Sequence, residues 1–227
     1  METYVVRMWL PDRPGALGAV ASRIGAVRGD VVGIDILETG DGVAVDELVV
    51  RLPRGSLVDL LVAEVQEVDG VTVEDVRPAG EGGHDPRLDA LETAALLCGA
   101  DTMDELLQAL VIHGGRTLGA SWAAVVDLSD GSVRARDGDS PPEAWLTAFV
   151  SGARMGGEDG GGSSTDVAWA PLPGVDLALV AGRTDTPFRA RERREVAALA
   201  RVAGTRAREV GHARFRRAHP STSGARG

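Results

Sequence analysis

The amino-acid sequence predicts an α+β protein of two domains, on three observations. Strand-type and helix-type segments alternate over residues 1–78, a glycine-rich stretch at 79–85 interrupts them, and a second mixed region spans 86–211. A chain of 227 residues is long enough for one or two domains that each bury a core. Residues 212–227 have little apolar content, so we expect a disordered basic tail there and a flexible linker at 79–85.

The first domain opens with a predicted strand, helix and strand. Residues 4–10 form a β-type run, which Pro11 ends. Apolar side chains then recur at i, i+3, i+4 and i+7, the stripe of an amphipathic helix, at Leu17, Val20, Ala21 and Ile24. Asp12 as the N-cap and Pro14 in the first turn are typical of a helix start. Residues 31–38 predict the second strand.

The remainder of this domain is predicted as strand, helix and strand. Gly40-Asp41-Gly42 is typical of a hairpin turn and leads into a third strand at 43–52, which Pro53 stops. Residues 71–76 predict the fourth strand. Between these strands lies a second helix, ended by Asp69-Gly70, with its apolar stripe at Leu57, Leu61, Val65 and Val68.

The resulting order, βαββαβ with short connections, predicts the ferredoxin-like arrangement. In that arrangement an antiparallel four-stranded sheet carries both helices on one face, and right-handed crossovers place the first and third strands in the middle. The opposite face of the sheet is left bare. We therefore expect it to pair with another surface or to be unusually polar. Asp46-Glu47, in the third strand, is interpreted as a solvent-facing pair.

The second domain is predicted to place helices at both ends of a small sheet. Helices are expected at 86–98, 102–118, 142–153 and 188–210, and strands at 122–128, 167–172 and 175–181. The first of these helices has its apolar stripe at Leu88, Leu91, Ala95 and Cys98. On such a stripe Cys98 is interpreted as a buried small hydrophobe.

Composition narrows the possible function classes. The sequence contains no lysine, which excludes a P-loop lysine and Schiff-base catalysis. Cys98 is the only cysteine, so no internal disulfide can form, as expected in a reducing compartment. The four histidines lack the spacing of a metal site, and no motif combines a nucleophile, an acid and a base. We expect no enzymatic activity, no cofactor and no metal.

The strongest candidate for a binding site is the turn from Leu10 to Leu17, between the first strand and the first helix. The start of a helix offers unpaired backbone N–H groups and the positive end of its dipole, and both can hold a carboxylate. Gly15 lacks the side chain that would block the approach of such a group. The alternative is an ordinary strand-to-helix turn in which Asp12 only caps the helix.

The βαββαβ order, together with Asp-Arg-Pro-Gly-Ala-Leu at its first turn, resembles ACT domains, which regulate amino-acid metabolism. The resemblance covers about residues 3–78. It implies a ligand site formed by this turn and by the second strand of a neighbouring ACT unit, and hence a homodimer. Many members have asparagine where this chain has Gly33. The ligand-binding residues that the resemblance implies are Asp12, Arg13, Pro14, Gly15, Ala16 and Leu17 in the turn, and Gly33, Ile34 and Asp35 in the second strand.

Residues 86–211 resemble GAF domains, which are sensory or dimerisation modules. The resemblance rests on four segments: Met103–Leu107, Gly119–Ala123, the hairpin Pro171–Val180 and Phe188–Glu192. It implies a small-ligand pocket or dimerisation through the end helices. Because the region between the strands is short and glycine-rich, a role restricted to dimerisation is also open.

Taken together, the sequence predicts a non-enzymatic regulatory protein that binds a small ligand, an amino acid, at an ACT-domain interface. Two alternatives stay open: a dimerisation scaffold without ligand, and a detached regulatory subunit of an amino-acid metabolic enzyme. Nucleic-acid binding through Arg201–Arg217 ranks last, because only Phe215 interleaves the arginines. No apolar run approaches the ~18 residues that cross a bilayer, and the N-terminus lacks a secretory pattern, so we expect a cytoplasmic protein.

Overall fold

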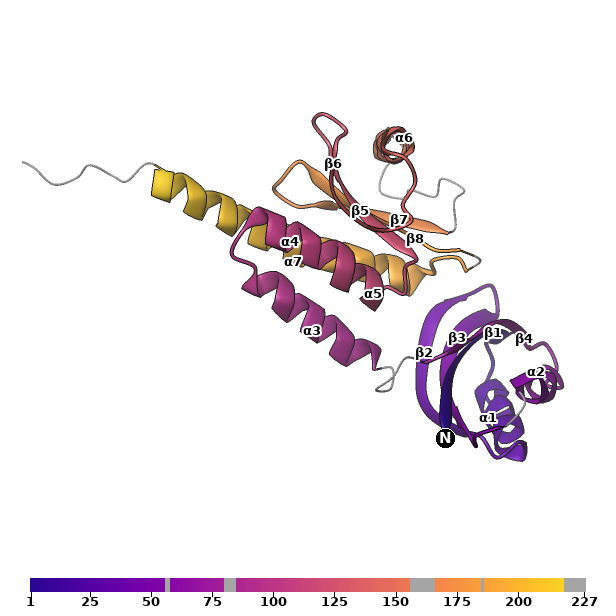
Figure 1. The fold of residues 1–227 in the computed structure, drawn as a ribbon. Helices are drawn as coiled ribbons and strands as arrows, with labels where there is room; N and C mark the ends of the chain where they lie inside the picture. The colour runs from indigo at the N-terminus through magenta and orange to yellow at the C-terminus, as the bar shows by residue number, and fades with distance from the viewer. Residues whose placement is uncertain (56–57, 80–84, 156–165, 185, 219–227) are drawn as a thin grey trace, which may run out of the picture. The chain divides into compact units, whose positions relative to one another are not determined.

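The structure is a computed structural model that describes residues 1–55, 58–79, 85–155, 166–184 and 186–218. These residues form two compact units, shown in Figure 1. Unit 1 consists of Met1–Pro86 together with Arg189–Glu192, and unit 2 consists of Arg87–Phe188 and Arg193–Gly227. Most of the predicted linker, residues 80–84, lies outside the described residues.

Unit 1 has the predicted order of elements. They are β1 (Glu2–Pro11), α1 (Ala16–Ala26), β2 (Asp30–Gly40), β3 (Val43–Leu52), α2 (Val58–Gln66) and β4 (Thr72–Pro78). All strand pairs are antiparallel, and the sheet order β2-β3-β1-β4 places β1 and β3 in the centre, as predicted. Both helices lie on one face of this sheet (Figure 1).

The covered face of the sheet holds the core of unit 1. Alternate residues of the central strands point toward the helices, and they pack with the apolar stripes of α1 and α2. Residues that are essentially inaccessible there include Met8, Val20, Leu48, Leu61 and Val65. The alternating apolar residues of the strands and the apolar stripes of the helices therefore form one apolar layer between the sheet and the helices.

The start of α1 differs from the prediction. The N-cap is Gly15 and not Asp12, and no side chain caps the helix. Gly15 has a φ of 89°, in the left-handed region, so Pro14 cannot belong to the helix that begins at Ala16. The amide of Asp12 instead donates to the carbonyl of Gly42, 2.9 Å away, which ties the turn to the β2–β3 hairpin.

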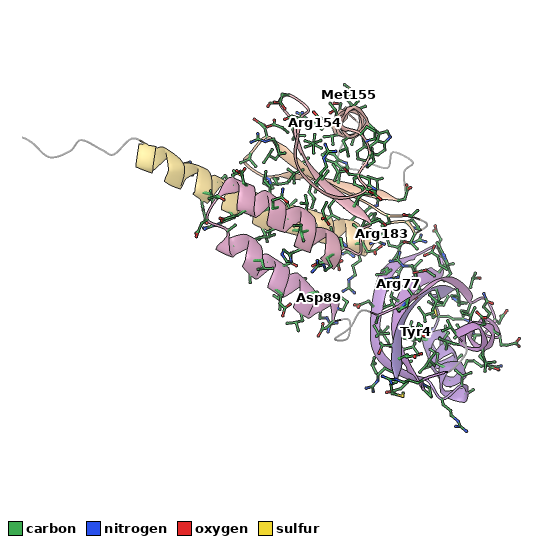
Figure 2. The ribbon with its side chains drawn as sticks, viewed as in Figure 1. Tyr4, Arg77, Asp89, Arg154, Met155 and Arg183 are labelled. Carbon is green, nitrogen blue, oxygen red and sulfur yellow. The ribbon has the colours of Figure 1, made fainter. Side chains whose placement is uncertain are left out.

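The opposite face of the sheet combines buried valines, such as Val5 and Val49, with a network of buried charges, and we call it the polar face. Arg7 is only 1% exposed and lies beside Glu47 in the β1–β3 register. Arg7 Nε donates to Glu47 Oε1 at 2.9 Å, and Arg77 Nη2 donates to the same oxygen at 2.7 Å. Figure 2 labels Arg77 in unit 1. Glu47 is thus held between two guanidinium groups and is not the solvent-facing residue predicted.

The segment Arg189–Glu192 packs on this polar face as part of unit 1. Glu192 Oε1 accepts a hydrogen bond from Arg7 Nη2 at 2.8 Å. The guanidinium of Arg189 lies 4.5 Å from the centre of the Trp9 ring and also contacts the carboxylates of Glu38 and Glu74. The segment that packs on this face therefore belongs to the same chain, which the sequence analysis did not predict.

Unit 2 is a second antiparallel sheet, of order β6-β5-β8-β7, between two helical layers. Helix α6 covers one face, and α4 and α7 cover the other (Figure 1). Its elements are α3 (Pro86–Gly99), α4 (Met103–Ala109), the π-helical turn η1 (Leu110–Gly114), α5 (Gly115–Thr117), β5 (Trp122–Asp127), β6 (Val133–Gly138), α6 (Glu143–Met155), β7 (Val167–Leu172), β8 (Leu177–Gly182) and α7 (Ala190–Ala218), whose residues up to Glu192 belong to unit 1.

Three features of unit 2 differ from the prediction. Strand β6 was not expected, because its edge-strand sequence is mostly polar and buries only Ala135. Helix α7 continues to Ala218, so residues 212–218 are helical where disorder was expected, and 219–227 lie outside the described residues. Cys98 is exposed and not buried. No helix among the described residues has the length and apolar character needed to cross a membrane.

The charge of Glu47 stabilises unit 1 in a pH-dependent way. Burial alone would raise the pKa of this carboxyl, but Arg77 and Arg7 outweigh it and hold the pKa below its ordinary value. A carboxyl with a lowered folded-state pKa adds stability above its unfolded-state pKa, and this stability is lost as the pH falls through the folded-state value.

We predict that Glu47→Gln lowers the free energy of unfolding by about 3 kcal/mol at neutral pH, because it leaves two guanidinium groups without their shared anion. Urea denaturation measures this loss. The loss should shrink in acid, where Glu47 of the wild type becomes protonated. Arg51→Gln is the matched control: it breaks the exposed Arg51–Asp30 pair on the same sheet and should cost less than about 1 kcal/mol. Equal losses in the two variants would contradict the prediction.

Candidate functional site

The turn between β1 and α1 is an exposed loop whose backbone is only partly hydrogen-bonded. Residues 12–15 are exposed, and Ala16 is the first buried residue of the helix. The amide of Ala16 donates to Arg13 O at 3.3 Å, and the amide of Ala19 donates to Gly15 O at 3.0 Å. Between them, the amides of Leu17 and Gly18 donate to no group among the described residues. These two N–H groups lie at the positive end of the helix dipole.

Gly15 is needed at this position for its conformation. Its left-handed φ of 89° is rare for residues with a side chain. A Cβ built on Gly15 would meet no atom within 4 Å, so the space beside it is open in any case. The structure therefore gives glycine a conformational reason at this position, and whether a side chain there would block a ligand stays a prediction.

The predicted second-strand residues lie on both faces of β2. The register pairs Gly33 with Val49 and Asp35 with Glu47, which places both residues on the polar face. Asp35 Oδ1 accepts from Arg191 Nη1 at 2.7 Å. Ile34 pairs with Leu48 on the helix-bearing face and is 44% exposed. Within one chain, the structure therefore does not bring Asp35 to the 12–17 loop.

Asp46 is a residue of this region that the sequence analysis interpreted wrongly. It lies opposite Met8 on the helix-bearing face, and it is 3% exposed and not solvent-facing. Its Oδ1 has no hydrogen-bond partner among the described residues. Burial and the nearby charge of Asp12 raise the pKa of the Asp46 carboxyl. Acidic residues in the middle of an apolar, central-strand sequence were the signal that could have identified it.

In unit 2, an aromatic cluster lies on the sheet face covered by α6. Trp145 stacks on Phe149, with ring centres 5.2 Å apart, and meets Trp122 edge to face at 6.3 Å. Trp122 also packs so close to Gly182 that a Cβ there would come within 2.2 Å of the indole ring. Among the described residues, no group of three His, Cys, Asp or Glu side chains could hold a metal ion.

Comparisons with known proteins give only distant structural likenesses. No family model matches the chain, and no curated protein matches it significantly. A formyltetrahydrofolate deformylase from Pseudomonas putida KT2440 aligns at 14% identity with a TM-score of 0.29, over 40% of this chain and 36% of that chain. A bacteriophytochrome from R. palustris aligns at 12% identity with a TM-score of 0.40, over 81% and 44%.

A third likeness is to an isolated domain. The GAF domain of a protein described as a sensor histidine kinase, from Pseudomonas syringae pv. tomato, aligns at 11% identity with a TM-score of 0.35, over 58% of this chain and 92% of the domain. The chain spans less than half of the deformylase and of the bacteriophytochrome. TM-scores this low assign neither a family nor a ligand to this protein.

We predict that Asp46→Asn raises the melting temperature at neutral pH. A carboxyl with a raised folded-state pKa destabilises the fold as the pH rises from its unfolded-state pKa through the folded-state value, and asparagine carries no such charge. The gain should disappear in acid, where both side chains are neutral. Melting curves from pH 3 to 8 measure it, with Asp30→Asn, an exposed carboxylate on the same sheet, as the control. A variant that is less stable than wild type at neutral pH would contradict the prediction.

Proposed function

We propose that this protein is a non-enzymatic regulator whose unit 1 is an ACT-type domain of ferredoxin-like arrangement that binds a small carboxylic acid at the 12–17 loop. The observation that supports this most directly is that the amides of Leu17 and Gly18, at the start of the eleven-residue helix α1, donate to no group among the described residues. A carboxylate accepts hydrogen bonds from such amides and is favoured by the helix dipole. The open space beside Gly15 gives it room.

An amino acid is the ligand class that fits the surroundings of these amides. The exposed Asp12 is the first residue of the loop and supplies a negative charge to which an α-ammonium group is attracted. Arg13 is exposed beside it and is available to a second carboxylate or to the polar part of a side chain. The loop therefore offers complementary groups to both ends of a zwitterion.

A homodimer is part of the proposal, because β2 is an edge strand with unused apolar surface. Val32, Ile34 and Ile36 are 46%, 44% and 53% exposed, and β2 has only β3 as a sheet neighbour. An exposed edge of this kind favours pairing with another strand. Of the two edge strands, β2 and β4, β2 is the one with large exposed apolar residues, so it is the edge proposed for a partner.

The alternative function is a dimerisation scaffold that binds no ligand. The exposed apolar residues of β2, namely Val32, Ile34 and Ile36, support this alternative as well as they support a ligand-binding regulator. The two functions differ in whether a small molecule stabilises the folded chain, since a ligand at 100 times its Kd adds about 2.7 kcal/mol to the free energy of unfolding.

We predict that at least one standard amino acid at millimolar concentration raises the melting temperature, and that Gly18→Asp weakens its binding about tenfold or more. The added carboxylate at the third helical position competes for the amides and repels an anion. Gly25→Asp is the matched control, because it adds the same charge near the other end of α1, and neither glycine has an atom within 4 Å of an added Cβ. If no amino acid raised the melting temperature, the scaffold without ligand would be favoured. If both variants bound the amino acid equally well, the binding site would have to lie elsewhere.

A further inference from the structure

Asp46 is a buried carboxyl group whose Oδ1 atom has no hydrogen-bond partner among the described residues. The residue is only 3% exposed. Glu47, the next residue, is also buried, but two arginines hold the pKa of its carboxyl down. The charge that acts on Asp46 is instead the like charge of Asp12, which raises the pKa of the Asp46 carboxyl in addition to burial. Burial of a polar group without a partner is unfavourable, so this residue requires a physical explanation.

The register places Asp46 close to the loop that precedes α1. Asp46 lies opposite Met8, three positions before the end of β1, on the face that carries the helices. Met8 and Ala16, the first residue of α1, belong to the same core cluster. Asp12, the first residue of the 12–17 loop, is near enough for its charge to act on the Asp46 carboxyl. The carboxyl group therefore borders the inner side of the proposed binding loop.

We propose that the Asp46 carboxylate binds the α-ammonium group of the amino acid whose own carboxylate is held by the amides of Leu17 and Gly18. This inference rests on the proposed function, and it names the residue that distinguishes an amino acid from other carboxylic acids. An ammonium group has hydrogen-bond donors for Oδ1, and its positive charge counters both burial and the repulsion from Asp12. The sequence contains no lysine, so no side chain of this chain carries an ammonium group.

The surroundings of Asp46 leave one side on which a small molecule can approach. Met8, its neighbour on β1, is inaccessible, whereas Ile36, its neighbour on β2, is 53% exposed. The ammonium and carboxylate groups of an α-amino acid are attached to the same carbon atom, so their binding groups have to lie near each other, as Asp46 and the loop do. Asp12 is exposed and attracts the ammonium group from solvent, and Asp46 is buried, where an ionic hydrogen bond is strongest.

This role also explains why a carboxylate is kept at a position where it destabilises the free protein. The Asp46→Asn variant is expected to be more stable than the wild type because the buried charge is absent. A residue of this kind is typical of a binding site, since its electrostatic repulsion is relieved only when the ligand is bound.

The experiment titrates the full chain calorimetrically with the standard amino acids and, for each one that binds, with its 2-hydroxy acid, in which a hydroxyl replaces the ammonium group. The wild type should bind the amino acid at least about tenfold more tightly than the hydroxy acid, because a hydroxyl brings no positive charge to Asp46. In Asp46→Asn the two Kd values should lie within about threefold of each other. The same preference in Asp46→Asn as in the wild type would overturn the contact.

Asp12→Asn is the matched control, because it removes the exposed carboxylate of the loop and leaves Asp46 in place. It should keep the preference for the amino acid over the hydroxy acid, and its binding should depend less on salt concentration, since exposed charges are screened. If Asp12→Asn lost the preference and Asp46→Asn kept it, the ammonium group would be bound by Asp12 and the proposal would be overturned.

The outcomes separate this contact from the proposed function. If no standard amino acid binds the wild type, the proposed function is rejected, and the Asp46 contact is rejected with it. If an amino acid binds the wild type and Gly18→Asp weakens that binding, but Asp46→Asn keeps the preference for the ammonium group, only the Asp46 contact is rejected.

Discussion

The polar face of unit 1 is built around the buried guanidinium of Arg7. A charge that is 99% shielded from solvent is tolerated only with close counter-charges, and Arg7 has two, Glu47 at 2.9 Å and Glu192 at 2.8 Å. Its planar group bonds one carboxylate from the neighbouring strand and one from a segment 185 positions later in the sequence. This requirement explains why Arg189–Glu192 belongs to unit 1.

The polar network also decides which surfaces are open to other molecules. Because Arg189–Glu192 packs on the face that the element order left bare, the contacts proposed for unit 1 use the β2 edge and the loop at the start of α1. The predicted ligand residue Asp35 instead pairs with Arg191. The loop retains two amides without partners among the described residues, so the binding proposal rests on the backbone and not on the second strand.

Sequence reasoning found the elements whose signals are local, and it failed where a residue's surroundings come from elsewhere. The first helix was predicted from its apolar spacing, whereas the left-handed backbone of Gly15 was not foreseen. Asp46 and Glu47 look alike in the sequence, but alternation places them on opposite sheet faces. Asp46 Oδ1 has no hydrogen-bond partner in the described part of the chain, whereas Glu47 lies between two arginines. Strand β6 was missed because its polar residues carry no burial pattern.

The sequence by itself determined the order of the elements, the turns at glycine and the apolar stripes, because periodicity and backbone conformation depend on neighbours a few residues away. Only the tertiary structure decided which stripe is buried and which charges meet. Helix α3 shows the reason: its sequence has apolar residues on two sides, and nothing local tells which side faces the core. Arg7 shows it again, since its partners come from another strand and from the first turn of α7, far along the chain.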